Sequence, residues 1–264
     1  MNLAFENVRE IYSGRLGVIV AQGAFADMII CLTEFAKNAR LQRVSLQAIE
    51  TLKGTVPRMF SCPECPLSEK ANGARGTEPT DGQRKKVSRN SKDDPIVKFL
   101  FPVLFAFHDI LMKGEDPEAR TRAVGYLFDT LVNYGGDFQA DFWDTICHEL
   151  LFPIFIVAKP RPEIVEMSNQ ESVDMRLSTT MIEALRDLIA LFTHYFDQLE
   201  RILDGFLDLL VTCIRQGNNT IARIGSSCLQ QLILQSVKKL RPEHWAKILN
   251  SGRSEEHTSE LQSP

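Results

Sequence analysis

The strongest hydrophobic pattern lies between Asp94 and Gly135 and predicts two antiparallel helices joined by a turn at Lys113–Asp116. From Ile96 to Met112 nearly every position is apolar, which is typical of a helix buried inside a layer of helices. The second arm, after Asp116, repeats apolar residues at helical spacing on one face only. Because a buried helix paired with a half-exposed one is the unit of an α-solenoid, we predict an all-α fold: an armadillo/HEAT-like α-solenoid of antiparallel helical hairpins.

Turn and capping signals set the ends of this second arm. Asp116 is a suitable N-cap, Pro117 fits the first helical position, and Glu118 places an acid in the first turn. Gly135 and Gly136 are expected to end the helix. The sequence therefore predicts a helix that starts at Pro117 and stops before Gly135.

Comparable periodic patterns predict helices over most of the remaining chain. The expected helical segments are residues 2–13, 24–37, 41–53, 138–158, 178–196, 199–214, 220–237 and 243–249. Gly14 and Gly17 are expected to break the first segment, and Gly54 and Pro57 to end the third.

Prolines and polar stretches predict where the helical pattern is disturbed. Pro102 and Pro153 should bend their helices, because proline lacks a backbone donor and clashes with the preceding turn. Residues 159–176 are expected to form a polar connector, after which Ser178 caps the next helix.

Composition divides the chain into four parts. Residues 1–60 are expected to form the first part of the helical solenoid and residues 94–250 the second. Between them, residues 61–93 are rich in Gly, Pro, Ser, Lys and Glu and are predicted to be a disordered insertion. The tail at residues 251–264 is predicted to be disordered, and its sequence RSEEHTSELQSP resembles the translation of a sequencing adapter. We expect a fragment truncated at both ends.

Charge and hydropathy exclude two classes of protein. The net charge of -4 offers no basic surplus for phosphates, so no nucleic-acid partner is expected. The longest uncharged apolar runs have about nine residues, whereas about 20 are needed to cross a bilayer. The chain is therefore expected to be cytoplasmic.

The six cysteines do not form a disulfide framework pattern. Four lie singly on apolar helical faces, where a thiol behaves as a small hydrophobe. These are Cys31, Cys147, Cys213 and Cys228. Cys62 and Cys65 form a lone CxxC, and because zinc prefers four ligands we expect two exposed thiols in a loop. Zinc binding or redox chemistry at this pair is the alternative.

Two further groups of polar residues have a structural and a functional interpretation. The basic run from Arg84 to Lys92 is interpreted as a solvated charge run, with anionic lipid binding or phosphorylation around Ser88 and Ser91 as alternatives. Five scattered histidines are interpreted as noncatalytic core or surface residues. They are His108, His148, His194, His244 and His257.

Three segments share a loose repeat that begins with arginine: RVSLQAIETL from Arg43, RAVGYLFDTL from Arg122 and RIGSSCLQQL from Arg223. Each follows an amide or acid that is expected to cap the second helix of a pair. These caps are Asn38, Asp116 and Asn218. We predict that the arginines are structural and reach the loop of a neighbouring repeat. No phosphate loop, HExxH, GxSxG or kinase motif occurs, so we predict no catalytic, cofactor-binding or metal-binding residue and no cofactor.

Several segments in order carry a family resemblance: NLAFENVREIYSGRLGVIVAQGAFADMIICLTEFAKN, DPIVKFLFPVLFAFHDILMKGEDPEARTRAVGYLFDTL, FWDTICHELLFPIF and NNTIARIGSSCLQQLILQ. They resemble the large Golgi guanine nucleotide exchange factors for Arf GTPases, the Sec-seven and brefeldin A-inhibited proteins, in a fungal-looking version. The resemblance falls in the regulatory solenoid downstream of the catalytic domain. It implies that the glutamate finger of that domain lies outside this chain, so no catalytic residue is carried over.

The resemblance implies a catalytic function for the parent protein and a regulatory one for this chain. The parent would exchange GDP for GTP on Arf at the trans-Golgi, and this region would tune that activity by autoinhibition, small-GTPase binding and membrane recruitment. The implied partners are small GTPases of the Arf/Rab type and other parts of the same exchange factor, with peripheral membrane association. A HEAT-type scaffold or transport receptor without exchange function is the alternative.

Overall fold

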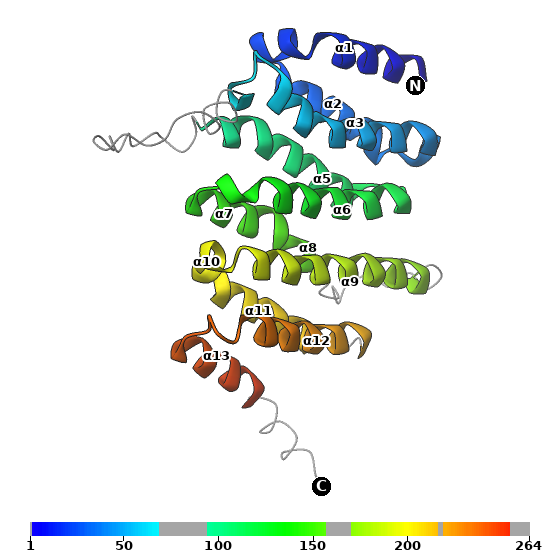
Figure 1. Ribbon diagram of the computed structural model, residues 1–264. Coiled ribbons are helices and arrows are strands. Elements are labelled where there is room, and N and C mark those ends of the chain that lie inside the picture. The colour runs from blue at the N-terminus through cyan, green and yellow to red at the C-terminus, as the bar shows by residue number, and fades with distance from the viewer. Residues whose placement is uncertain (1, 69–93, 157–169, 216–218, 254–264) are drawn as a thin grey trace, which may run out of the picture. The chain divides into compact units, whose positions relative to one another are not determined.

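The computed structural model describes residues 2–68, 94–156, 170–215 and 219–253 (Figure 1). Within these ranges every regular element is a helix, which confirms the predicted all-α, solenoid-like fold class. The chain divides into two compact units, Met1–Thr130 and Leu131–Pro264.

The first unit is built of helical pairs. Its elements are α1 (Asn2–Ala21), α2 (Phe25–Lys37), η1 (Ala39–Leu41), α3 (Gln42–Ser61), η3 (Ile96–Leu100), α5 (Phe101–Lys113) and α6 (Pro117–Tyr134), the last of which crosses the unit boundary. Helix α2 packs against α3 within one pair and against α5 of the next. Helices α5 and α6 meet where the rings of Phe107 and Tyr126 lie 6.0 Å apart. The first helices of the two pairs thus contact each other, and an ion pair between Arg122 and Glu50 links the second helices, α6 and α3.

The predicted hairpin of α5 and α6 is confirmed with its turn and its cap. The Asp116 Oδ1 atom accepts hydrogen bonds from the backbone N–H groups of Glu118 at 2.8 Å and Ala119 at 3.3 Å. Helix α6 ends at Tyr134, directly before the expected glycines. The apolar first arm is largely core, because Phe99 and Phe107 are buried, although Phe105 is 47% exposed.

One predicted helix end in the first unit is wrong, and one predicted break is present as a kink. Helix α1 runs through Gly14 and Gly17, but its backbone leaves the helical conformation at Arg15, directly after Gly14, where φ is −136° and ψ is 29°. Helix α3 contains Gly54 and Pro57, which were predicted to end it. An internal glycine costs only about 1 kcal/mol relative to alanine.

Tertiary packing explains why α3 also continues through Pro57. Beyond Gly54 the helix buries Thr55, Val56 and Met59, and Pro57 itself is exposed. The Thr55 hydroxyl also lies 2.8 Å from the Tyr12 hydroxyl of α1. These buried contacts offset the backbone hydrogen bond that proline removes.

The second unit continues the all-helical plan. Its elements are η4 (Gly135–Asp137), α7 (Ala140–Ile146), η5 (Cys147–Leu151), α8 (Pro153–Ile156), α9 (Gln170–His194), α10 (Phe196–Leu199), η6 (Glu200–Ile202), α11 (Leu203–Ile214), α12 (Asn219–Ser236) and α13 (Pro242–Arg253). Helix α12 packs against both α9 and α11. Stacked rings of Phe192 and Phe206, 4.6 Å apart, lie in the core that these helices share.

Pro102 and Pro153 each follow an irregular helical turn. The π-helical turn η3 precedes Pro102 and the π-helical turn η5 precedes Pro153, where the Phe152 N–H bonds the Cys147 carbonyl at 2.9 Å. A wider turn relieves the clash between a proline ring and the preceding carbonyl. The predicted disturbance of these two helices is therefore present as a π turn.

Two boundaries in the second unit differ from the prediction. Helix α9 begins at Gln170, so Ser178 lies inside the helix and part of the predicted connector is helical. Helix α13 continues to Arg253, so the tail boundary predicted at residue 251 falls inside it. The residues added to α9, QESVDMRL, contain neither Gly nor Pro and extend an existing helix at little cost.

Candidate functional site

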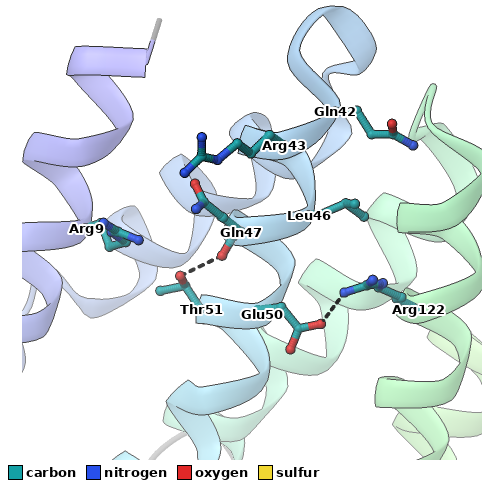
Figure 2. Close-up of a pocket in the computed structure, with 8 residues that line it drawn as sticks. All are labelled: Arg9, Gln42, Arg43, Leu46, Gln47, Glu50, Thr51 and Arg122. Atoms are coloured by element: carbon teal, nitrogen blue, oxygen red, sulfur yellow. Dashed lines mark hydrogen bonds and ion pairs between the residues drawn. The ribbon is translucent and has the colours of Figure 1, made fainter.

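A groove of about 620 Å³ lies on the first unit and is lined by three of its helices (Figure 2). Its lining residues come from α1, α3 and α6 and are mostly polar. They are Arg9, Gln42, Arg43, Leu46, Gln47, Glu50, Thr51 and Arg122. Three arginines against one glutamate make the lining positively charged.

Helix α3 supplies most of the groove through two rows of side chains. Residues four apart share a helical face. Figure 2 shows Arg43 and Gln47 pointing to the α1 side, and Leu46 and Glu50 pointing to the α6 side. The regular period of α3 thus presents both a cationic and an amide group toward α1.

Arg122 ties α6 to α3 at one wall of the groove. Its Nη1 lies 2.6 Å from Glu50 Oε1, and its Nη2 lies 2.6 Å from Glu118 Oε1. These two carboxylates raise the pKa of Arg122. The Tyr126 hydroxyl also donates to Glu50. Burial, together with this hydrogen bond to Glu50, raises the pKa of Tyr126 to about 12, and Lys53 Nζ lies 4.1 Å from the centroid of its ring.

The other two arginines of the groove differ in their partners. Arg9 Nη2 pairs with Glu6 Oε2 at 2.5 Å on α1. Arg43 is exposed and forms no ion pair with any residue that the structure describes. The groove therefore contains one arginine, Arg43, without an ion pair in the described part of the chain, beside Arg9, which pairs with one carboxylate, and Arg122, which pairs with two.

The three repeat-related arginines do not share one role. Arg122 reaches a neighbouring helix as expected, although its partner is Glu50 within α3 rather than a loop. Arg43 and Arg223 are both exposed. Glu50 was not among the predicted residues, and its only signal in the sequence is its place in the repeat segment RVSLQAIETL.

The predicted caps of the repeat also differ from one another. Asp116 caps α6 as described above. Asn38 Oδ1 accepts the Arg40 N–H at 2.9 Å and so caps the short helix η1, not α3. Asn218 lies outside the described residues.

The CxxC pair is less exposed than the sequence suggested. Cys65 is fully buried and Cys62 is half-buried, with its Sγ donating to Glu64 Oε2 at 3.1 Å. Leu67 is buried as well, so the start of the predicted insertion packs on the first unit. Burial raises the pKa of both thiols. The prediction of two exposed thiols is wrong for Cys65, and the basic run at residues 84–92 lies outside the described residues.

The histidines in the described ranges make packing or capping contacts. The rings of His108, His148 and His194 lie against Phe105, Phe152 and Tyr195 respectively. His244 Nδ1 accepts the Arg241 N–H at 3.2 Å at the start of α13. His257 lies outside the described residues. Among the residues that the structure places, no three His, Cys, Asp or Glu side chains gather in a metal-binding group.

Within the same residues, no helix is long and apolar enough to span a bilayer. Three of the exposed large apolar side chains, Leu3, Ile11 and Val18, lie on α1, and the others lie on other helices or next to their ends. Examples of the others are Ile30 and Leu234.

Comparison with known proteins finds relatives that are all named as guanine nucleotide-exchange factors or exchange proteins. The chain is 45% identical over 232 residues to the ADP-ribosylation factor guanine nucleotide-exchange factor SEC7 of Saccharomyces cerevisiae, a match that covers 88% of this chain and 11% of that protein. It is 31% identical over 246 residues to the exchange factor sec72 of Schizosaccharomyces pombe, covering 93% of this chain and 12% of the relative. Brefeldin A-inhibited guanine nucleotide-exchange protein 1 of Homo sapiens is 25% identical over 228 residues, covering 86% of this chain and 11% of the relative.

The chain thus spans roughly a tenth of the length of these relatives, 11% or 12% in each of the three. No family model matches it, and no solved structure matches it.

Proposed function

We propose that this chain, a homologue of one segment of the ADP-ribosylation factor (Arf) guanine nucleotide-exchange factors, is a noncatalytic helical region that tunes nucleotide exchange on an Arf-type GTPase. The observation that carries the proposal is the 45% identity to the Saccharomyces cerevisiae factor over 88% of the chain. Similarity over nearly the whole of this chain supports a role inside such a factor.

The fold supports tuning through contacts. Packed helical pairs present long surfaces and change shape by small shifts between repeats. In this proposal the region binds small GTPases of the Arf/Rab type and other parts of the same exchange factor. Such contacts inhibit or release the catalytic domain and recruit the parent protein from the cytoplasm to the trans-Golgi membrane as a peripheral protein.

The first test asks whether the chain is noncatalytic. Release of a fluorescent nucleotide from Arf is followed with and without the purified chain. We expect no acceleration, because the proposal assigns it no residue that displaces nucleotide. A several-fold faster release would contradict the proposal.

The second test separates a GTPase-binding region from a general helical scaffold. Arf- and Rab-type GTPases are loaded with GDP or with a nonhydrolysable GTP analogue and passed over the immobilised chain. Binding that depends on the bound nucleotide supports the proposal, since the switch segments of a GTPase differ between the two states. Equal retention of both forms favours a HEAT-type scaffold or transport receptor without exchange function.

A further inference from the structure

The groove presents one arginine on each of three helices. Arg9 comes from α1, Arg43 from α3 and Arg122 from α6 (Figure 2). Packed helices are separated by roughly 8–10 Å. Arginines carried by helices at about this axial spacing suit an elongated anionic ligand better than a single small anion.

An extended peptide has a matching period. In the polyproline II conformation every third side chain returns to the same face, after an advance of about 9 Å. Acidic side chains three residues apart would therefore meet the arginines of successive helices. An α-helix would need about six residues to cover the same distance.

The amides of the groove add contacts for a peptide backbone. Gln42 and Gln47 each carry a side-chain donor and a side-chain acceptor. The backbone N–H and C=O groups of a polyproline II segment have no partners within the segment itself. Leu46, between these two glutamines in the sequence, offers an apolar contact.

The internal carboxylates of the groove disfavour a densely charged ligand. Arg122 already holds Glu50 and Glu118, and Arg9 already holds Glu6. Glu50 also lines the groove and would repel clustered phosphates. Separate carboxylates can avoid Glu50 and still reach the remaining N–H groups of each guanidinium, which carries five donors.

We propose that this groove binds an extended acidic segment of a partner protein, with carboxylates three residues apart. Arg43 makes the central contact, because its guanidinium has no ion-pair partner in the described part of the chain. This inference does not depend on the role in Arf exchange, since peptide binding is measured without any GTPase.

The test measures fluorescence anisotropy of a labelled peptide with glutamate at every third position in a proline–alanine background. The whole chain is titrated into it at low and moderate salt. A second peptide carries glutamine in place of each glutamate. We expect the glutamine peptide to bind at least about tenfold more weakly, and the affinity of the glutamate peptide to fall as salt rises.

Protein variants locate the site. Arg43→Glu should weaken binding of the glutamate peptide by at least about tenfold, and Arg43→Gln by less. The matched control is Arg223→Glu, an exposed arginine at the same place in another repeat, which should bind as the parent chain does. Circular dichroism of each variant confirms that the helices remain.

Any of four results would overturn the inference. The glutamate and glutamine peptides could bind equally, or neither could bind. Arg43→Glu and Arg223→Glu could have the same effect on affinity. Anionic vesicles or RNA could bind at Arg43 while the glutamate peptide does not, which would assign the groove to another class of macromolecule.

Discussion

Among the described residues of the first unit, two ion pairs link successive helical pairs, one on each layer of helices. Between the first helices, Lys37 of α2 lies 2.8 Å from Asp109 of α5. Between the second helices, Arg122 of α6 lies 2.6 Å from Glu50 of α3. The side chains are 17% and 10% exposed in the first pair, but 35% and 45% exposed in the second. The two links are similar in length and differ in burial.

The difference in burial suggests different roles for the two layers: the first helices hold the unit together, and the second helices present a surface. Loss of one partner of a buried pair leaves an uncompensated charge, whereas water and salt screen an exposed pair. The Lys37–Asp109 link should therefore stabilise the unit much more than the Arg122–Glu50 link. The layer of second helices can then carry binding residues whose replacement leaves the fold intact.

The largest effect is expected for Asp109→Ala. This substitution leaves the largely buried Lys37 with only the exposed Glu34, at 2.5 Å, as a carboxylate partner, and it removes the contact of Lys113 with Asp109 Oδ1 at 2.7 Å. The free energy of unfolding should fall by about 2–3 kcal/mol in urea titrations. Asp129→Ala, at an exposed position of α6, is the control and should change it by less than about 0.5 kcal/mol. Equal losses in the two variants would remove the distinction between the layers.

The loss of stability at low pH should depend on the same carboxylate, that of Asp109. Burial alone would raise the pKa of Asp109, but hydrogen bonds from Lys113 and Lys37 outweigh it and hold that pKa below its ordinary value. A carboxyl group with a lowered pKa in the folded state stabilises the fold above its unfolded pKa of about 4 and loses this contribution as pH falls through the folded pKa. The urea concentration at the midpoint of unfolding should therefore decrease as the pH is lowered below about 4.

The control for this pH dependence is Asp109→Asn. Its amide does not titrate, so part of the acid-induced loss should disappear. An unchanged midpoint profile in Asp109→Asn would show that other carboxyl groups cause the loss.

A smaller effect is expected for Arg122→Ala. Both of its ion pairs are partly exposed, so the free energy of unfolding should fall by less than about 1 kcal/mol. Arg223→Ala is the matched control. Arg120, the nearest arginine on α6, is not a suitable control, because its side chain is half-buried and burial lowers its pKa. A loss above about 2 kcal/mol for Arg122→Ala would mean that both layers hold the unit equally.

The smallest effect is expected for Tyr126→Phe. It removes only the hydroxyl that donates to Glu50, and Glu50 keeps Arg122 as a partner. The unfolding free energy should change by about 0.5 kcal/mol, less at high salt. A larger loss that is insensitive to salt would assign the hydroxyl to the core.

The fold was largely predictable because its signals are local. Helical periodicity and the cap at Asp116 depend on residues within a few turns of each other. The continuation of α3 through Gly54 and Pro57 was not predictable, because it depends on packing against distant residues such as Tyr12. Burial of Cys65 has the same origin.

The candidate site was less predictable than the fold. Arg122 stood out by repetition, but its partner Glu50 lies 72 residues away and is one acid among many in the sequence. The groove itself requires three helices to be brought together, since Arg9, Arg43 and Arg122 are distant in the chain. Periodicity places each arginine on a helix and cannot place the helices beside one another.

The most direct test of the proposed role measures nucleotide release from an Arf GTPase catalysed by the Saccharomyces cerevisiae exchange factor SEC7 with its matching segment replaced by this chain. Two control proteins carry either a deletion of that segment or an unrelated helical array of the same length. We expect the replacement to keep the rate of the parent factor, and both controls to change it several-fold. If the unrelated array or the deletion works as well as this chain, the chain does not tune exchange.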